Sequence, residues 1–132
     1  MFDPNDWELD THEHRIYADD TLERYAIVDD IDYQWACQWK WHINKPHPTR
    51  TGKKEYFRRS TSWGQNYKPP LYLHVEIMKR TDVLPETEKH ILVDHLDGNE
   101  FNCRRSNLVW ATHVENRNNQ HGKRAKQQAL HV

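Results

Sequence analysis

The segment from residue 94 to residue 116 reads DHLDGNEFNCRRSNLVWATHVEN, and it decides how the surrounding chain is expected to fold. An apolar run ends at Asp94 and His95, and a polar loop leads to a second short apolar run. Thr112 to Glu115 then gives the S/T-x-x-E pattern of a capping box, which marks the start of a helix. The order strand, loop, strand, helix predicts that polar side chains from these elements converge on one small pocket.

The polar residues of this segment are suited to a hydrolytic metal site. Asp94 supplies a hard carboxylate oxygen, and Asn116 supplies an amide oxygen on the predicted helix. Mg²⁺ prefers oxygen ligands and retains several waters, so one carboxylate, one amide and a substrate phosphate form a sufficient set. His95 is the natural general base, because its unperturbed pKa lies near neutrality. Asn107 either holds the loop or orients the histidine through its side-chain amide.

The geometry of a strand sets a condition on this site, because neighbouring side chains point to opposite faces. Asp94 and His95 can serve one site only if the strand ends or bends there, and Gly98 permits such a turn. His113 lies one helical turn before Asn116 and is an alternative ligand or an outer contact. Taken singly, each of these residues also has an ordinary explanation, such as an Asn or Asp in a turn.

The segment resembles the HNH endonucleases, and most closely their phage and intron-encoded branch, with its pattern DH-x-DGN…N-x-R-x-x-NL…EN. The first His of the family name falls on His95, the Asn on Asn107, and the third position on Asn116, where this branch has Asn. The matching residues are Asp94, His95, Asp97, Gly98, Asn99, Asn102, Arg104, Asn107, Leu108, Trp110, Thr112, Glu115 and Asn116. The resemblance extends upstream to residues 72–74 and, more weakly, to residues 28–33. The chain departs from the branch at Val75, commonly Arg, and at Cys103, often Asn.

The resemblance implies an α+β fold with a ββα-metal motif, also called the HNH or His-Me finger. It implies Asp94 and Asn116 as ligands of a divalent ion, Mg²⁺ or Mn²⁺, with His95 as general base. The expected reaction is hydrolysis of phosphodiester bonds in double-stranded DNA, leaving a 5′ phosphate and a 3′ hydroxyl. Another class of function is a DNA-binding protein that keeps the fold without activity, and a toxin or restriction nuclease is a further possibility. A monomer would nick, whereas a homodimer could cut both strands.

Length and composition are those of a small domain with arms. The chain has 132 residues, of which 36% are hydrophobic, and six Trp and six Tyr supply much of that fraction. No run approaches the roughly 20 apolar residues of a membrane span. The acidic N-terminus lacks the plan of a secretory signal, so a cytoplasmic location is expected. Cys37 and Cys103 lack the paired spacing of a zinc site and suit a reducing compartment.

Charge is distributed unevenly, although the net charge is only −1. Residues 1–33 hold 11 acidic and 2 basic side chains, whereas residues 34–69 hold 8 basic and 1 acidic. A local basic patch is what phosphate contacts require. The alternative is a solvated face, which is common for charged runs. The predicted nucleic-acid-binding residues are Lys53, Lys54, Arg58, Arg59, Arg104 and Arg105.

Four regions are predicted along the chain. Residues 1–20 form an acidic arm, 21–72 a small α+β module with an aromatic-rich antiparallel sheet, 73–122 the catalytic region, and 123–132 a basic tail. The module is predicted to hold a strand over 25–28, a helix over 31–37 capped by Asp29 or Asp30, and a half-buried strand through Trp39 and Trp41. Its other strand candidates are Tyr56-Phe57 and Tyr72-Leu73, followed by a helix over 74–80. The Trp residues either form the core or face DNA.

Overall fold

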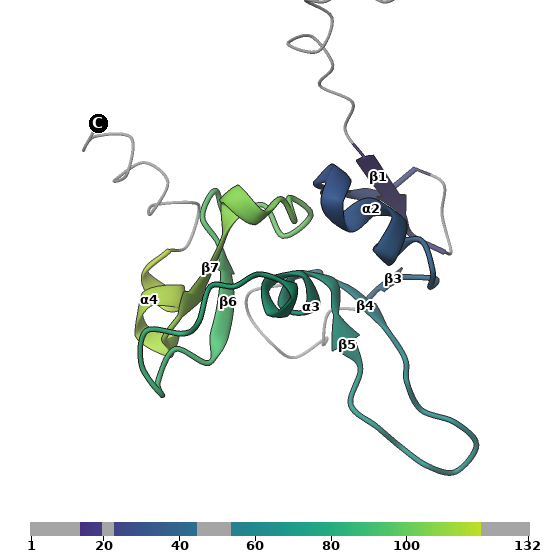
Figure 1. The fold of residues 1–132 in the computed structure, drawn as a ribbon. Helices are drawn as coiled ribbons and strands as arrows, with labels where there is room; N and C mark the ends of the chain where they lie inside the picture. The colour runs from purple at the N-terminus through teal and green to yellow at the C-terminus, as the bar shows by residue number, and fades with distance from the viewer. Residues whose placement is uncertain (1–13, 20–22, 45–53, 120–132) are drawn as a thin grey trace, which may run out of the picture.

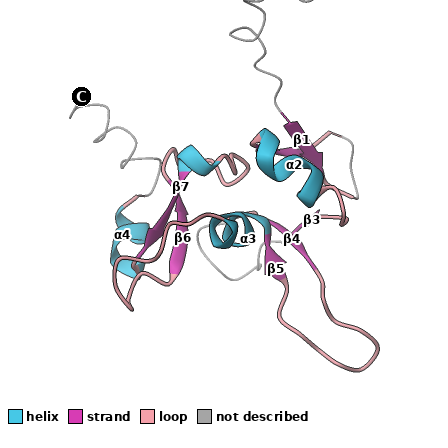
Figure 2. Ribbon diagram, viewed as in Figure 1, coloured by secondary structure: helices cyan, strands magenta, loops and turns pink. Residues whose placement is uncertain are grey.

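The computed structural model describes residues 14–19, 23–44 and 54–119 (Figure 1). Short strands and short helices are interspersed along this part of the chain, which gives an α+β architecture (Figure 2). The elements in chain order are β1 (His14–Tyr17), β2 (Tyr25–Val28), α2 (Asp30–Ala36), β3 (His42–Ile43), β4 (Phe57–Arg59), β5 (Leu71–Tyr72), α3 (Leu73–Arg80), β6 (Leu92–His95), the 3-10 turn η1 (Arg105–Asn107), β7 (Leu108–Ala111) and α4 (His113–Asn118).

The strands form three small antiparallel sheets. β1 pairs with β2, β4 lies between β3 and β5, and β6 pairs with β7. In the last pair Asp94 lies opposite Val109, and His95 lies opposite Leu108. An isolated two-stranded hairpin is marginally stable in water, so the β1–β2 and β6–β7 pairs depend on packing against their neighbours.

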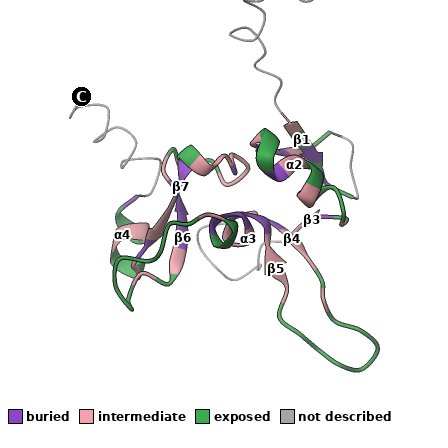
Figure 3. Cartoon of the chain, in the orientation of Figure 1, coloured by how far each residue is buried: buried purple, intermediate pink, exposed green. Residues whose placement is uncertain are grey.

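One hydrophobic core joins the sheets across the predicted region boundary at residues 72 and 73. The alternation of β2 buries Ala26 and Val28, as period-2 patterning requires. These side chains pack in one cluster with Trp41 and Phe57 from the module and with Leu108 of β7. The buried residues, coloured purple in Figure 3, therefore run through both predicted regions rather than forming two separate cores.

Backbone hydrogen bonds fasten β2 to the loop that follows β6. Ile27 N donates to Phe101 O at 2.8 Å, and Cys103 N donates to Ile27 O at 2.8 Å. The result is a parallel bridge between Ile27 and Asn102. This loop carries the polar residues of the family-like segment, so the N-terminal sheet directly fixes its position.

A buried carboxylate adds a second link between the same two regions. Asp32 of α2 is fully buried, and its Oδ2 and Oδ1 accept hydrogen bonds from Arg105 Nε at 2.9 Å and Nη2 at 2.8 Å. Arg80 Nε, at the end of α3, donates to Asp32 Oδ1 at 3.1 Å, and the Arg80 guanidinium lies 4.5 Å from the Trp35 ring centre. Hydrogen bonding to Asp32 raises the pKa of Arg105. Three elements thus meet at one carboxylate.

The predicted elements agree with the structure in most places. The helix predicted over 31–37 is confirmed as α2, and the helix predicted over 74–80 is confirmed as α3. The strands predicted over 25–28 and near residues 56–57 and 72–73 are present, with bounds shifted by one or two residues. Trp41 is buried in the core, which is one of the two roles considered for the Trp residues.

Three local predictions are wrong. Residues 14–17 of the predicted acidic arm form β1, because pairing with β2 lets Ile16 enter the core. Trp39 and Trp41 lie outside any strand, since β3 begins only at His42. Asp29 occupies the N-cap position of α2, but it does not make the predicted side-chain cap; its Oδ2 instead accepts a hydrogen bond from Arg105 N at 2.7 Å.

Some predictions fall outside the described residues. These concern the first part of the acidic arm, Lys53, the end of the catalytic region at residues 120–122, and the basic tail. Among the helices that are described, none has the length and apolarity needed to cross a bilayer.

The Asp32 carboxylate should be a major source of stability. Replacing Asp32 with Ala leaves two guanidinium groups without their shared partner, and breaking a buried pair typically costs about 3–5 kcal/mol. Arg105 and Arg80 side chains are 28% and 33% exposed, so water offsets part of this loss. We expect Asp32→Ala to lower the free energy of unfolding by about 2–4 kcal/mol in urea titrations.

The matched control is Asp30→Ala on the same helix, whose side chain is 93% exposed and lies 3.1 Å from His14 Nε2 at the surface. This change should alter stability little, because exposed ion pairs contribute weakly. Equal effects of the two substitutions would contradict the assignment.

Candidate active site

The candidate site begins at the end of β6. Asp94 and His95 are its last two residues, and both are buried. Gly98 N donates to His95 O at 2.9 Å, and Gly98 adopts a φ of 77°, a conformation that favours glycine. The strand therefore ends at His95 and the chain turns directly after it, while Asp94 and His95 are both still paired with β7. That the two side chains serve one site stays a prediction.

His95 lies in a cluster of aromatic rings. Its ring centre is 4.7 Å from that of His74 on α3 and 6.1 Å from that of Tyr56, which is nearly parallel to it. Tyr56 also stacks on His74 with ring centres 5.0 Å apart. His95 Nε2 is buried and has no hydrogen-bond partner among the described residues. A buried polar atom without a partner is costly unless something else binds there, which makes Nε2 the notable atom of the site.

The surroundings of His95 keep its imidazole neutral. Burial lowers the pKa of His95 to about 4; Asp97 opposes this shift, and Lys54 adds to it. Burial also lowers the pKa of His74, with a further contribution from His95. Burial raises the pKa of Tyr56 to about 12, so its hydroxyl stays protonated. At neutral pH the His95 ring therefore retains a nitrogen lone pair that can accept a proton.

Asn107 organises the loop between β6 and β7. Its Nδ2 donates to Asp97 Oδ1 and to Asn102 O, both at 2.9 Å, and its Oδ1 accepts from Asp97 N at 3.0 Å. Its backbone O accepts from Leu96 N at 2.8 Å, directly beside His95. Of the two roles considered for Asn107, these bonds correspond to holding the loop.

Asp97 is a residue whose role the sequence did not indicate. Besides its bonds to Asn107, its Oδ1 accepts from Asn99 N at 2.8 Å, and its Oδ2 accepts from Asn102 Nδ2 at 2.9 Å. It thus closes the loop around one carboxylate. Its place in the family-like pattern was visible, but spacing alone could not show which loop partners it would bind.

Helix α4 begins as predicted with a capping box. Glu115 N donates to Thr112 Oγ1 at 3.1 Å, and Thr112 N donates to Glu115 Oε1 at 3.0 Å. The helix packs against β6 and β7. On it, Asn116 is half-buried, whereas His113 is exposed.

Asn119 joins the end of α4 to the site. Its side chain is buried, and its Nδ2 donates to His95 O at 2.8 Å. This bond fixes the helix that carries Asn116 against the strand that carries Asp94. Sequence reasoning missed Asn119, and the only signal was its position one turn after Asn116.

The donor chemistry fits a hard divalent ion. Asp94 is a buried carboxylate, and Asn116 is an amide on a helix packed on the same strand. His95 Nε2 is a buried atom with no partner in the described part of the chain. The residues that the structure describes contain no group of three or more His, Cys, Asp and Glu side chains able to hold a metal. A site with few protein oxygens suits Mg²⁺, which keeps several waters.

The predicted nucleic-acid-binding residues have different surroundings. The Arg105 guanidinium is held by Asp32, which leaves it less free to bind phosphate. The Arg59 guanidinium lies 4.1 Å from the Trp39 ring centre, and Arg58 Nε and Arg59 Nε are buried without a partner among the described residues. Lys54 is exposed and Arg104 is half-buried. Their contact with DNA stays a prediction.

Comparison with known proteins gives one match. Residues 84–118 match the family model HNH_3, described as HNH endonuclease. The matched stretch holds β6, η1, β7 and α4, about a quarter of the chain. No curated protein and no solved structure matches the chain. The match supports the resemblance to HNH endonucleases over this stretch and indicates nuclease activity on DNA.

Acid should destabilise the protein through the buried histidines. Above pH 6.5 His95 is neutral in both the folded and unfolded chain; between pH 6.5 and about 4 only the unfolded chain takes up the proton. Stability is therefore full above pH 6.5 and falls as the pH drops toward 4, by about 3 kcal/mol for His95. His74 contributes in the same direction.

Urea titrations in EDTA at several pH values between 7.5 and 4.5 would measure this slope. His95→Gln should reduce it, while His113→Gln, on the exposed side of α4, should leave it unchanged. Identical slopes in wild type and His95→Gln would show that His95 is not buried in its neutral form.

Proposed function

We propose that the protein is a metal-dependent DNA endonuclease with its active site at the end of β6. The observation that carries this proposal is His95 Nε2, which is buried without a partner among the described residues and belongs to the residue that follows the buried Asp94 in β6. The match of residues 84–118 to an HNH endonuclease model supports the same site. Asp94 and Asn116 would hold the divalent ion, Mg²⁺ or Mn²⁺, in a ββα-metal arrangement of β6, β7 and α4.

The protein side chains have separate tasks in phosphodiester hydrolysis. When bound, the divalent ion supplies charge stabilisation at a phosphate oxygen and at the leaving 3′ oxygen. His95 accepts a proton at Nε2 from the attacking water, and its neutral state at pH 7 makes this possible. Tyr56 and His74 hold the imidazole plane through ring contacts. Asn107 and Asn119 fix the loop and the helix on either side of the strand.

The proposed substrate is double-stranded DNA, and the proposed role is nicking or homing-type cleavage as in phage or mobile-element enzymes. The basic stretch from residue 34 to residue 69 supplies the positive charge that backbone contacts need. Its single acidic residue, Glu55, is paired with Arg24 through two hydrogen bonds of 2.8 and 3.0 Å. The proposed phosphate contacts in this stretch are therefore Lys53, Lys54, Arg58 and Arg59.

The proposed general base can be tested on supercoiled plasmid. With Mg²⁺ or Mn²⁺ the wild type should convert it to the nicked or linear form, and EDTA should stop the reaction. His95→Ala should lower the rate about 10²–10⁴-fold, the usual contribution of general-base catalysis, while duplex binding persists. His113→Ala is the matched control and should retain most activity. Cleavage by His95→Ala at the wild-type rate would refute the base assignment, and wild-type binding without cleavage would favour an inactive DNA-binding protein.

The metal ligands can be tested by calorimetric titration of Mn²⁺ together with cleavage. Asp94→Asn should abolish most metal binding because it removes the only carboxylate of the proposed set, and cleavage should fall with it. Asn116→Ala should weaken both, since it removes one neutral ligand. If His113→Ala proves as damaging as Asp94→Asn while Asn116→Ala is silent, the helix ligand is His113.

A further inference from the structure

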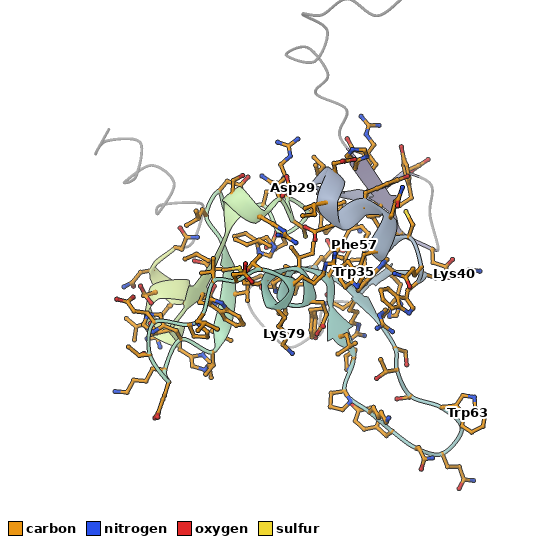
Figure 4. The ribbon with its side chains drawn as sticks, viewed as in Figure 1. Asp29, Trp35, Lys40, Phe57, Trp63 and Lys79 are labelled. Atoms are coloured by element: carbon orange, nitrogen blue, oxygen red, sulfur yellow. The ribbon has the colours of Figure 1, made fainter. Side chains whose placement is uncertain are left out.

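The loop between β4 and β5, here called the 60–70 hairpin (residues 60–70), projects from the body of the described part of the protein (Figure 1). Figure 1 shows it extending away from the rest of the fold, and Figure 3 shows most of it exposed. Two large aromatic side chains lie on it: Trp63 is 84% exposed and Tyr67 is 79% exposed. In Figure 4, Trp63 lies at the far end of the hairpin and points away from the body.

Hydrogen bonds within the hairpin hold its backbone, so the two aromatic side chains are exposed in a defined conformation. Trp63 N donates to Asn66 O at 3.2 Å, and Asn66 N donates to Trp63 O at 3.0 Å, which closes a two-residue turn with Gly64 at a φ of 60°. Ser62 Oγ donates to Lys68 O at 3.1 Å and accepts from Lys68 N at 2.9 Å. The two aromatic residues are thereby held on one tight tip.

The charge of the hairpin favours a polyanion as its partner. From residue 56 to residue 75 the chain has no Asp or Glu, whereas it has Arg58, Arg59 and Lys68. The two arginines lie on β4 at the base of the hairpin, and Lys68 lies near its tip. Between the two aromatic residues, Gln65 and Asn66 are exposed and offer amide donors and acceptors of the kind that read base edges.

We propose that the 60–70 hairpin is a DNA-contacting probe, separate from the cleavage site, in which Trp63 and Tyr67 pack against bases and sugars in a groove of the duplex. The inference rests on the proposed function for the identity of the substrate. Apolar side chains inserted between base steps anchor many DNA-binding proteins. The tip would add affinity for the duplex, while the basic residues at its base contact phosphates and set the register.

The test is duplex affinity, measured in EDTA by the anisotropy of a labelled DNA at several salt concentrations. Trp63→Ala with Tyr67→Ala should weaken binding roughly 5- to 100-fold, the range that aromatic contacts to bases give on truncation. The slope of log affinity against log salt should not change, because an aromatic ring releases no counterions. Arg58→Ala with Lys68→Ala should instead flatten that slope by about 0.9 for each lost phosphate contact.

The controls separate the hairpin from general effects. Leu84→Ala removes an 83% exposed apolar side chain from the loop before β6 and should leave affinity unchanged. Trp63→Phe keeps an aromatic ring and should retain most of the affinity. Single-turnover cleavage at saturating protein should be near wild type in the double aromatic variant, because the proposed chemistry is at Asp94 and His95. Both aromatic side chains lie outside the core, so circular dichroism should show an intact fold.

Three results would overturn the proposal. Wild-type affinity in the double aromatic variant, with the wild type cleaving DNA, would reject the hairpin while leaving the nuclease proposal intact. A loss of dimer mass in the variant without loss of DNA affinity would identify the tip as a contact between two copies of the chain. Failure of the wild type both to bind duplex and to cleave it would reject both proposals.

Discussion

The Asp32 carboxylate is the interaction on which the arrangement of this small fold depends. Its two oxygens bind Arg105 and Arg80, and so they connect α2, the end of α3 and the 3-10 turn before β7. Two of the described sheets have only two strands, and such a pair is marginally stable by itself. The bridge between Ile27 and Asn102 and the Asp32 cluster supply the directional contacts that a small apolar core lacks. As a consequence, the guanidinium of Arg105, which was predicted from the sequence to contact DNA, is instead hydrogen-bonded to Asp32.

The same packing defines the chemistry of the candidate site. Burial against Tyr56 and His74 leaves His95 neutral and leaves its Nε2 without a partner among the described residues. A neutral imidazole can accept a proton at physiological pH, whereas an exposed histidine would be partly protonated below pH 6.5. Stability and function are therefore coupled: the burial that makes His95 available as a base also makes the metal-free protein sensitive to acid.

Features that depend on neighbouring residues in sequence were predictable. The capping box of Thr112 and Glu115 and the helices over α2 and α3 follow from local patterns, and the structure has them. The HNH-like segment was identified from residue types at fixed spacings, and the family match covers it. The turn at Gly98 was also expected, because glycine adopts a positive φ far more readily than other residues do, and Gly98 has a φ of 77°.

Features that depend on distant residues were not predictable. Nothing local distinguishes Asp32, fully buried, from Asp30, two residues earlier and exposed; only the approach of Arg105 and Arg80 makes the difference. Pairing with β2 converted part of an acidic arm into β1, and periodicity placed Trp39 and Trp41 in a strand that begins after them.

The central claim is that Asp94, His95 and Asn116 surround one divalent ion, and paramagnetic relaxation tests it most directly. Substoichiometric Mn²⁺ added to isotope-labelled protein broadens the NMR signals of nuclei nearest the bound ion. The account predicts that signals of Asp94, His95 and Asn116 disappear first, while those of Asp30 and Gly64 persist. Broadening centred on the carboxylates around His90, where Glu86 and Glu115 lie, would contradict it. So would the absence of any localised broadening.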